Sequence, residues 1–207
     1  MINSFLLKIV KNIANFSTDE KTFVTIGTFD GVHFGHQKII EKLIDEAKKA
    51  DKKSVVLTFF PHPRMVLQKD ASIELINTID ERAALLEKTG LDYLIIHPFS
   101  KEFSRMTALE FVRDILVNQL NISKLIIGYD HHFGKNREGN IEQLTGYSLL
   151  YNFVVEEIPA QDIDDVSVSS TKVRRALADG NLQNANKYLG YNFMLNGFKT
   201  VAKSELN

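Results

Sequence analysis

The chain has 207 residues, of which 44% are hydrophobic and 25% are charged, with a formal net charge of −1. These values fit a globular domain and give no overall field that would draw it to nucleic acid or an anionic membrane. Because cysteine is absent, disulfides, thiolate nucleophiles and cysteine-ligated metals are excluded.

Short β-rich runs alternate with amphipathic helical runs along the chain. We expect strands at 23–29, 54–60, 92–97, 124–129 and 152–158. Helices are expected over 39–47, behind the capping boxes Thr78–Glu81 and Thr107–Glu110, over 141–149, and from a cap at Ser170 to Gly180. This alternation predicts an α/β fold in which a five-stranded, mostly parallel sheet has helices on both faces. The carboxyl ends of such strands meet at one edge, where ligands bind.

The first expected strand ends in the segment GTFDGVHFGH, residues 27–36. Its three glycines allow a close backbone approach to a ligand, and the helix that begins near Gly35 offers an anion site. His33 and His36 lie one turn apart and can stabilise charge on the same phosphoryl group, as imidazolium or as N–H donors. An ordinary tight turn with surface histidines is a weaker interpretation. So is a metal site, because no third ligand lies nearby in the sequence.

Two further strand ends carry aromatic side chains. Residues 58–64, TFFPHPR, place Phe59 and Phe60 at the ligand edge, although core aromatics would give the same pattern. Residues 128–139, GYDHHFGKNREG, mix aromatic, cationic and glycine residues. A planar ring could stack on Phe133 and a phosphate could meet Lys135 or Arg137, unless the segment is simply a solvated loop.

A second candidate phosphate cradle lies at the start of the last expected helix, in VSSTKVRR, residues 168–175. Its hydroxyls and backbone N–H groups can bind phosphate oxygens, and Arg174 lies one turn further on. A well-capped helix with a charged face is the alternative. Asp162, Asp164 and Asp165 precede it and read as a solvated acidic loop, with magnesium binding a lesser alternative.

Together these segments resemble a known family. Residues 27–36 resemble the G-x-F-D-G-x-H-x-G-H signature in the adenylyltransferase module of prokaryotic bifunctional riboflavin kinase/FAD synthetases. Residues 58–63, 128–139 and 169–174 resemble that family's T-F-x-P-H-P, G-x-D/N-x-x-F-G-x-x-R-x-G and S-S-T-x-I/V-R segments. The H-x-G-H part alone is shared by cytidylyl- and adenylyltransferases in general. The resemblance covers roughly residues 21–196 and implies a Rossmann-like nucleotidyltransferase fold.

The resemblance also implies a reaction, in which AMP passes from ATP to FMN in one in-line step, with Mg²⁺ assisting and no covalent enzyme intermediate. It implies that the catalytic residues are His33, His36, Ser170, Thr171 and Arg174. The ATP-binding residues would be Gly27, Phe29, Asp30, Gly31, His33, Gly35, His36, Ser169, Ser170, Thr171 and Arg174. The flavin-binding residues would be Phe60, Pro61, His62, Pro63, Asp130, Phe133, Gly134 and Arg137.

Residues 188–197 resemble the junction to the riboflavin kinase barrel of that family. We therefore expect an adenylyltransferase domain over 1–190 and a mobile remnant of the junction over 191–207. No kinase motif is present, so no riboflavin phosphorylation is expected. Two alternatives stay open, namely transfer to another phosphorylated acceptor, and binding of flavin or nucleotide without turnover.

The sequence also bears on location. No apolar run approaches the ~18 residues that span a bilayer. Residues 1–7 form an apolar patch without a charged leader or a small-residue cleavage site, so we expect no secretory signal. We therefore expect a cytoplasmic protein without membrane or nucleic-acid partners, and the sequence leaves its oligomeric state open.

Overall fold

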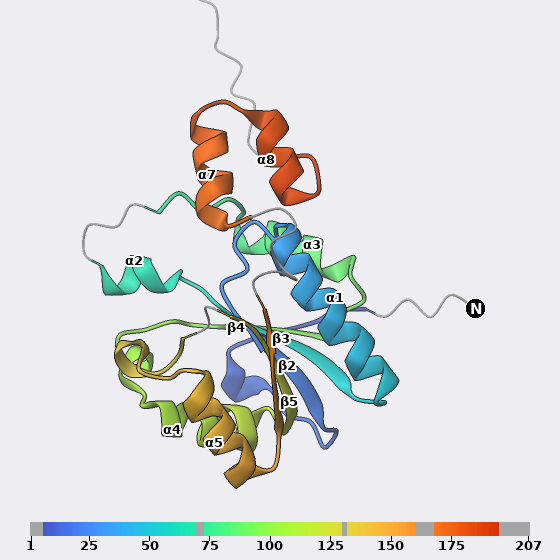
Figure 1. Ribbon diagram of the computed structural model, residues 1–207, viewed down its shortest axis with the longest axis vertical. Helices are drawn as coiled ribbons and strands as arrows, with labels where there is room; N and C mark the ends of the chain where they lie inside the picture. The colour runs from blue at the N-terminus through green and yellow to red at the C-terminus, as the bar shows by residue number, and fades with distance from the viewer. Residues whose placement is uncertain (1–5, 69–72, 130–131, 160–167, 195–207) are drawn as a thin grey trace, which may run out of the picture.

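The computed structural model describes residues 6–68, 73–129, 132–159 and 168–194, except for the side chain of Arg137. A parallel sheet forms the centre of the molecule, with helices on both faces (Figure 1). The strand order is β1-β4-β3-β2-β5-β6, and every neighbouring pair runs parallel. The predicted Rossmann-like α/β class is therefore confirmed.

The strands are short and their buried residues are largely β-branched or leucine, as is usual for a parallel sheet that is covered on both faces. Val24 in the central strand pairs with Val55 on one side and Leu125 on the other. The six strands of the described residues are β1 Lys8–Lys11, β2 Thr22–Ile26, β3 Lys53–Phe59, β4 Tyr93–His97, β5 Ile122–Gly128 and β6 Val154–Ile158.

Helices connect the strands and cover the sheet. They are α1 Phe34–Lys49, α2 Pro63–Leu67, α3 Ile79–Glu87, α4 Ala108–Glu110, α5 Ile141–Tyr151, α7 Ser170–Ala178 and α8 Leu182–Leu189. Helix α4 runs directly into the π-helix η3 Phe111–Gln119. Short 3-10 turns are η1 Ile13–Asn15, η2 Phe103–Arg105 and η4 Lys135–Arg137. Among the described helices, none has both the length and the apolar character that a membrane span requires.

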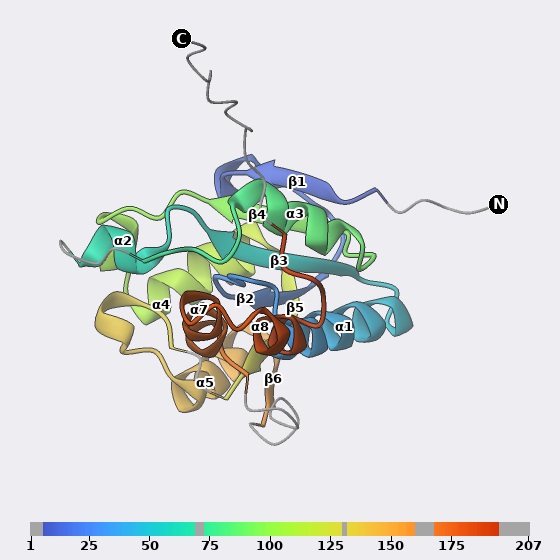
Figure 2. The same cartoon turned by 90° about the horizontal axis from the view of Figure 1, so that it is seen from above.

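The core lies in two layers, one on each face of the sheet. Helices α1 and α3 bury Ile40, Leu43 and Leu86 on one face, and η3 and α5 bury Leu116 and Leu144 on the other. Helices α7 and α8 form a hairpin with its own apolar cluster. The hairpin sits above the end of β2 at which α1 begins, as the two perpendicular views show (Figures 1 and 2).

Capping chemistry predicted several helix starts correctly. Thr78 with Glu81, and Thr107 with Glu110, both form reciprocal capping boxes in the structure. The predicted cap at Ser170 was wrong by one residue, because Ser169 accepts the bond from the N–H of Lys172 and frees Ser170 for another contact.

Strand β1 and helix α8 are among the elements that were not anticipated. The sheet has six strands where five were predicted, because β1 is a four-residue edge strand with three exposed positions and no periodic signal. Helix α8 was also missed, since its eight residues bury only Ala185 and Leu189 between the turns at Gly180 and Gly190.

Candidate functional site

The turn after β2 is bent through left-handed backbone conformations. Phe29, Gly31 and Val32 have φ angles of 48°, 84° and 36°. A Cβ on Gly31 would also lie 2.8 Å from Cδ1 of Ile76, so only glycine fits there without a shift. Such conformations cost energy for Phe29 and Val32 and persist only where neighbouring groups fix them.

Side chains from several elements hold the carbonyl groups of this turn. The Thr28 carbonyl accepts bonds from Arg82 Nη1 at 2.7 Å and from Thr58 Oγ1 at 3.1 Å. The Asp30 carbonyl accepts from Ser170 Oγ at 2.9 Å. The Gly31 carbonyl accepts from the Tyr191 hydroxyl at 2.6 Å, and the Val32 carbonyl accepts from Gln37 Nε2 at 2.8 Å. These carbonyl groups therefore have protein partners, and the bonds fix the turn from several elements.

Asp30 is the centre of a buried charge network. Its carboxylate is fully buried and accepts bonds from Arg82 Nη2 at 3.1 Å and Arg174 Nη2 at 2.5 Å. It also accepts from the backbone N–H of Ile76 at 3.1 Å. Arg82 is itself only 1% exposed, and Arg174 Nε donates to the Glu74 carbonyl. The Asp30 carboxylate therefore links the turn to α3, to α7 and to the backbone of Ile76.

His33 and His36 stack at the start of α1, with ring centroids 3.6 Å apart and planes 16° apart. His33 Nδ1 accepts the bond from the His36 N–H at 3.4 Å, which leaves the ring proton of neutral His33 on Nε2. Among the described residues, His36 Nδ1 is buried without a hydrogen-bond partner. The ring of Phe29, which is 3% exposed, lies edge-on against His36.

Both histidines are held neutral near pH 7. Burial is the main cause that lowers the pKa of His33 to about 4, against an opposing effect of Asp30. Burial also lowers the pKa of His36 well below its ordinary value, and the neighbouring His33 and Arg82 add to the effect. Of the two forms considered from sequence, the neutral N–H donor is the one that the structure supports.

The second candidate cradle lies against the first. Ser170 Oγ and the Arg174 guanidinium both contact Asp30, so the start of α7 is bonded to the turn after β2. Thr171 is exposed beside them, and Ser169 caps the helix. Gly27 continues β2 through a bond to the Leu57 carbonyl, and Gly35 is buried in the first turn of α1. These positions match the grouping predicted from the sequence, while their roles toward ATP stay predictions.

The segment after β3 presents a more open surface. Phe60 is 41% exposed and Pro61 is exposed, whereas Phe59 packs among Phe99 and Phe103. His62 caps α2 by accepting from the Arg64 N–H, and Pro63 occupies the first turn of that helix.

The environment of His62 places this segment near the turn. Burial is the main cause that lowers the pKa of His62 to about 4, while the charge of Asp30 raises it and that of Arg174 lowers it. The charges of Asp30 and Arg174 therefore affect the pKa of both His62 and His33, although the two histidines follow different strands.

Phe133 is a buried residue. Its ring is 7% exposed and packs on Phe111 at 5.7 Å, within the core. Gly139 exchanges two backbone bonds with it, and a Cβ on Gly139 would lie 2.5 Å from the ring. The ring is therefore largely covered by protein, and a contact between Phe133 and flavin stays a prediction.

The remaining predicted flavin contacts are partly outside the structure. Gly134 has φ 73° and packs tightly against the backbone of Ala108. Asp130, the acidic loop at 162–165 and the tail from residue 195 lie outside the described residues, as does the side chain of Arg137.

Sequence reasoning missed three residues that build the site. Arg82 is a charged residue on the buried side of α3, next to Ala83 and one turn before Leu86, and that position was a usable signal. Gln37 and Tyr191 carried no such signal, because their partners are far away in the sequence. Gln37 donates to the Leu189 carbonyl at the end of α8, and Tyr191 donates to the Gly31 carbonyl.

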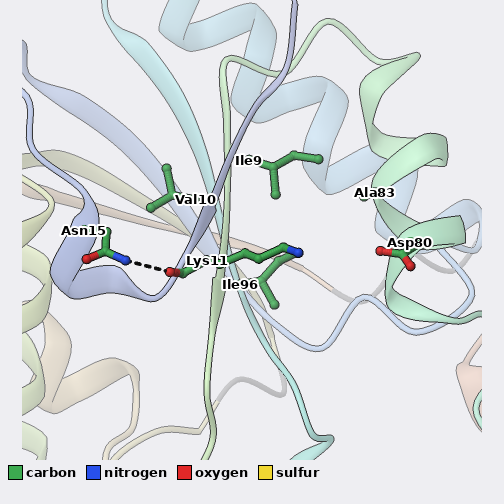
Figure 3. A pocket seen from close by; sticks show the side chains of 7 residues that line it. All are labelled: Ile9, Val10, Lys11, Asn15, Asp80, Ala83 and Ile96. Atoms are coloured by element: carbon green, nitrogen blue, oxygen red, sulfur yellow. Dashed lines mark hydrogen bonds between the residues drawn. The ribbon is translucent and has the colours of Figure 1, made fainter.

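A shallow depression lies elsewhere, between the edge strand β1 and helix α3 (Figure 3). It is lined by Ile9, Val10, Lys11, Asn15, Asp80, Ala83 and Ile96. It shares no residue with the predicted site. The turn after β2 that carries His33 and His36, residues 27–36, is called the histidine turn below and remains the candidate functional site.

A stacked histidine pair at the start of a helix, at the carboxyl edge of a parallel sheet, defines a Rossmann-like protein of the nucleotidyltransferase class. The sequence pattern of the FAD synthetase family matches residues 15–172, and the chain belongs to that family.

Relatives of known name agree with this membership. The bifunctional riboflavin kinase/FMN adenylyltransferases of Buchnera aphidicola subsp. Schizaphis graminum and Escherichia coli strain K12 are each 34% identical over 193 residues. That match covers 92% of this chain and 62% of either relative, so the chain spans less than two thirds of their length. The protein of the same name from Haemophilus influenzae is 36% identical over 84% of this chain and 56% of its own.

A solved structure has the same fold. It is described as a macrolide-efflux protein from Streptococcus pneumoniae, and it superposes with a TM-score of 0.78 at 29% identity. The match covers 90% of this chain and 60% of that chain.

Proposed function

We propose that this chain transfers AMP from ATP to FMN, giving FAD and pyrophosphate. Family membership supports the reaction, as does the name FMN adenylyltransferase that its bifunctional relatives carry. The observation that carries the proposal is the neutral, stacked pair His33–His36 at the start of α1, on the same turn as Asp30, whose carboxylate bonds to Arg174 of α7. This arrangement joins the two groups of side chains that we propose to bind phosphate at one edge of the sheet.

The proposed step is a single displacement at phosphorus. An oxygen of the FMN phosphate attacks the α-phosphorus of ATP, and the bond from that phosphorus to the bridging oxygen of the β-phosphate breaks. Pyrophosphate leaves with the electron pair, so no proton transfer and no covalent enzyme intermediate are needed. Catalysis then rests on alignment and on stabilising charge at the phosphoryl oxygens.

The histidine turn would supply that stabilisation. Neutral His33 offers its Nε2–H as a donor, and the free N–H groups at the start of α1 add a favourable dipole. A donor that is already neutral and fixed by stacking needs no reorganisation as charge develops. His36 lies in the same stack and would share this role.

The ATP phosphates would meet the start of α7. Arg174 uses Nε for the Glu74 carbonyl and Nη2 for Asp30, which leaves Nη1 for a phosphate oxygen. Ser169, Ser170 and Thr171 lie in the first turn of the same helix. The nucleotide would also contact the backbone of the turn, at Gly27, Phe29, Asp30, Gly31 and Gly35.

The flavin would occupy the side of the site next to β3. Phe60 is an exposed aromatic ring directly after β3, and Pro61, His62 and Pro63 follow it along the chain. Asp130, Phe133, Gly134 and Arg137 remain proposed contacts, although the Phe133 ring is only 7% exposed.

Magnesium would enter with ATP. The described residues contain no group of three or more His, Cys, Asp or Glu side chains that could hold a metal ion. Mg²⁺ usually binds substrate phosphates and takes few protein ligands. We assign no catalytic step to it. A cytoplasmic location stays a prediction from the sequence.

An acceptor panel tests the proposal. The protein is incubated with ATP, Mg²⁺ and, separately, FMN, phosphopantetheine or nicotinamide mononucleotide, and the products are identified by mass. We expect FAD and pyrophosphate with FMN alone. Product from another acceptor in place of FMN would overturn the proposal, as would tight binding of FMN and ATP without pyrophosphate release.

A further inference from the structure

The α7–α8 hairpin is fastened to the histidine turn at three consecutive carbonyl groups. Ser170 at the start of α7 donates to the Asp30 carbonyl, and Tyr191 beyond α8 donates to the Gly31 carbonyl. Gln37 uses its amide nitrogen twice, donating at 2.8 Å to Val32 and at 2.8 Å to Leu189 at the end of α8. The turn is therefore held from the C-terminal side of the chain as well as by the sheet.

Among the residues that make these contacts, Tyr191 is the last along the chain. It follows Gly190, whose φ of 76° ends α8 and turns the chain back toward the site. The hydroxyl lies 2.6 Å from the Gly31 carbonyl and 3.2 Å from Oδ1 of Asn77, just before the cap of α3. Burial raises the pKa of Tyr191 to about 12, so the hydroxyl keeps the proton that it donates.

The Gly31 carbonyl, which accepts the bond from Tyr191, lies in the middle of the histidine turn. Gly31 stands between Asp30, which carries the buried charge network, and His33, which caps α1. The flanking Phe29 and Val32 are both in strained backbone conformations, with φ of 48° and 36°. Losing the donor would leave a partly buried carbonyl unpaired, and the turn would relax at the cost of histidine alignment.

We propose that Tyr191 is a positioning residue for adenylyl transfer. Its hydrogen bond to the Gly31 carbonyl fixes the turn that aligns His33, and it ties the segment after α8 to the site. This inference rests on the proposed function, because the alignment matters for the transfer to FMN. Tyr191 itself contacts no reacting atom in this account.

Tyr191→Phe tests the inference, with Tyr188→Phe as a matched control. Tyr188 lies in the same apolar cluster, but its hydroxyl makes no hydrogen bond within the described residues. Both variants lose one phenolic oxygen and keep the ring. For Tyr191→Phe we expect kcat for FAD formation to fall about tenfold, with KM for FMN within about twofold, since small misalignments lower rate more than binding. Tyr188→Phe should match the wild type.

Hydrogen exchange gives a second measurement that does not depend on turnover. In peptides that contain residues 27–36, Tyr191→Phe should exchange faster than the wild type, and Tyr188→Phe should not. Wild-type rates and unchanged exchange in Tyr191→Phe would overturn the inference, as would equal losses in the two variants. If the wild type itself made no FAD, the proposed function would fail, and exchange would still decide whether Tyr191 holds the turn.

Discussion

The guanidinium of Arg174 bonds to the carboxylate of Asp30 at 2.5 Å, although the two residues lie 144 positions apart in the sequence. The bond joins the start of α7 to the turn after β2. Both segments were predicted separately as phosphate cradles, and this ion pair makes them one site. Asp30 is shared with buried Arg82, so one carboxylate balances two guanidinium groups.

Replacing Asp30 with Asn should destabilise the protein. The change leaves the guanidinium of Arg82, which is 1% exposed, without a counter-charge. Breaking a buried ion pair in this way costs about 3–5 kcal/mol. Urea unfolding at neutral pH should therefore show a large fall in the free energy of unfolding.

Asp114→Asn is the matched control for this change. Asp114 also pairs with an arginine, Arg113, but the two side chains are 40% and 46% exposed, and such solvent-accessible pairs add little stability. We expect a wild-type unfolding curve for it. Equal losses in the two Asp→Asn variants would show that the Asp30 network is not a stabilising centre.

Arg174→Ala should weaken ATP binding more than FMN binding. The loss of a charge-assisted bond to phosphate costs about 1.5–3 kcal/mol, which corresponds to about tenfold or more in Kd. Calorimetry with a non-hydrolysable ATP analogue and with FMN measures the two affinities. Arg175→Ala is the control, because that side chain points to solvent and is 86% exposed. A selective loss of FMN binding in Arg174→Ala would mean that the two halves of the pocket are reversed.

His36→Ala should lower kcat by about 100-fold or more, the usual result of removing a donor to a transition-state oxygen. The ring stacks on His33 and lies over Phe29, but the backbone bond that starts α1 uses the His36 N–H, which alanine retains. The far-ultraviolet circular dichroism spectrum should therefore stay the same. A variant with the wild-type rate would remove His36 from its assigned role.

Stability should fall as the medium becomes acidic, in part through His33. The pKa of His33 is about 4 in the folded protein, chiefly through burial, whereas in an unfolded chain the pKa of this side chain is about 6.5. Between these values the unfolded state binds more protons, so acid favours it, by up to about 1.4 kcal/mol per pH unit for each such histidine.

Urea unfolding at about pH 6.5 and about pH 5 measures this dependence. The free energy of unfolding should fall less between the two conditions in His33→Gln than in the wild type, because glutamine does not titrate. The same fall in both proteins would contradict the buried, neutral state of His33.

Local signals predicted the fold well. The β-rich runs around β2 to β6 and both capping boxes at Thr78 and Thr107 are encoded by neighbouring residues, and they appear in the structure. Strand β1 was not predicted, because an exposed edge strand of four residues has no periodic pattern. Helix α8 escaped because it is short and packs on α7 through few apolar side chains.

The site was predicted less completely, because its bonds are long-range. The glycines and histidines of the turn were visible in one segment, whereas the donors Arg82 and Tyr191 reach it from elements far along the chain. The burial of Phe133 was not visible in the sequence, since an aromatic residue after a strand can pack in a core or contact a ligand. Burial, which decides such cases, depends on the whole fold.

Labelled ATP tests the central claim most directly. The protein is given FMN, Mg²⁺ and ATP that carries the label on either the α- or the γ-phosphorus. Adenylyl transfer predicts that the α-label enters FAD and that the γ-label leaves as pyrophosphate, in equal amounts. Appearance of the γ-label as inorganic phosphate or on a flavin, with no α-label in FAD, would contradict the account.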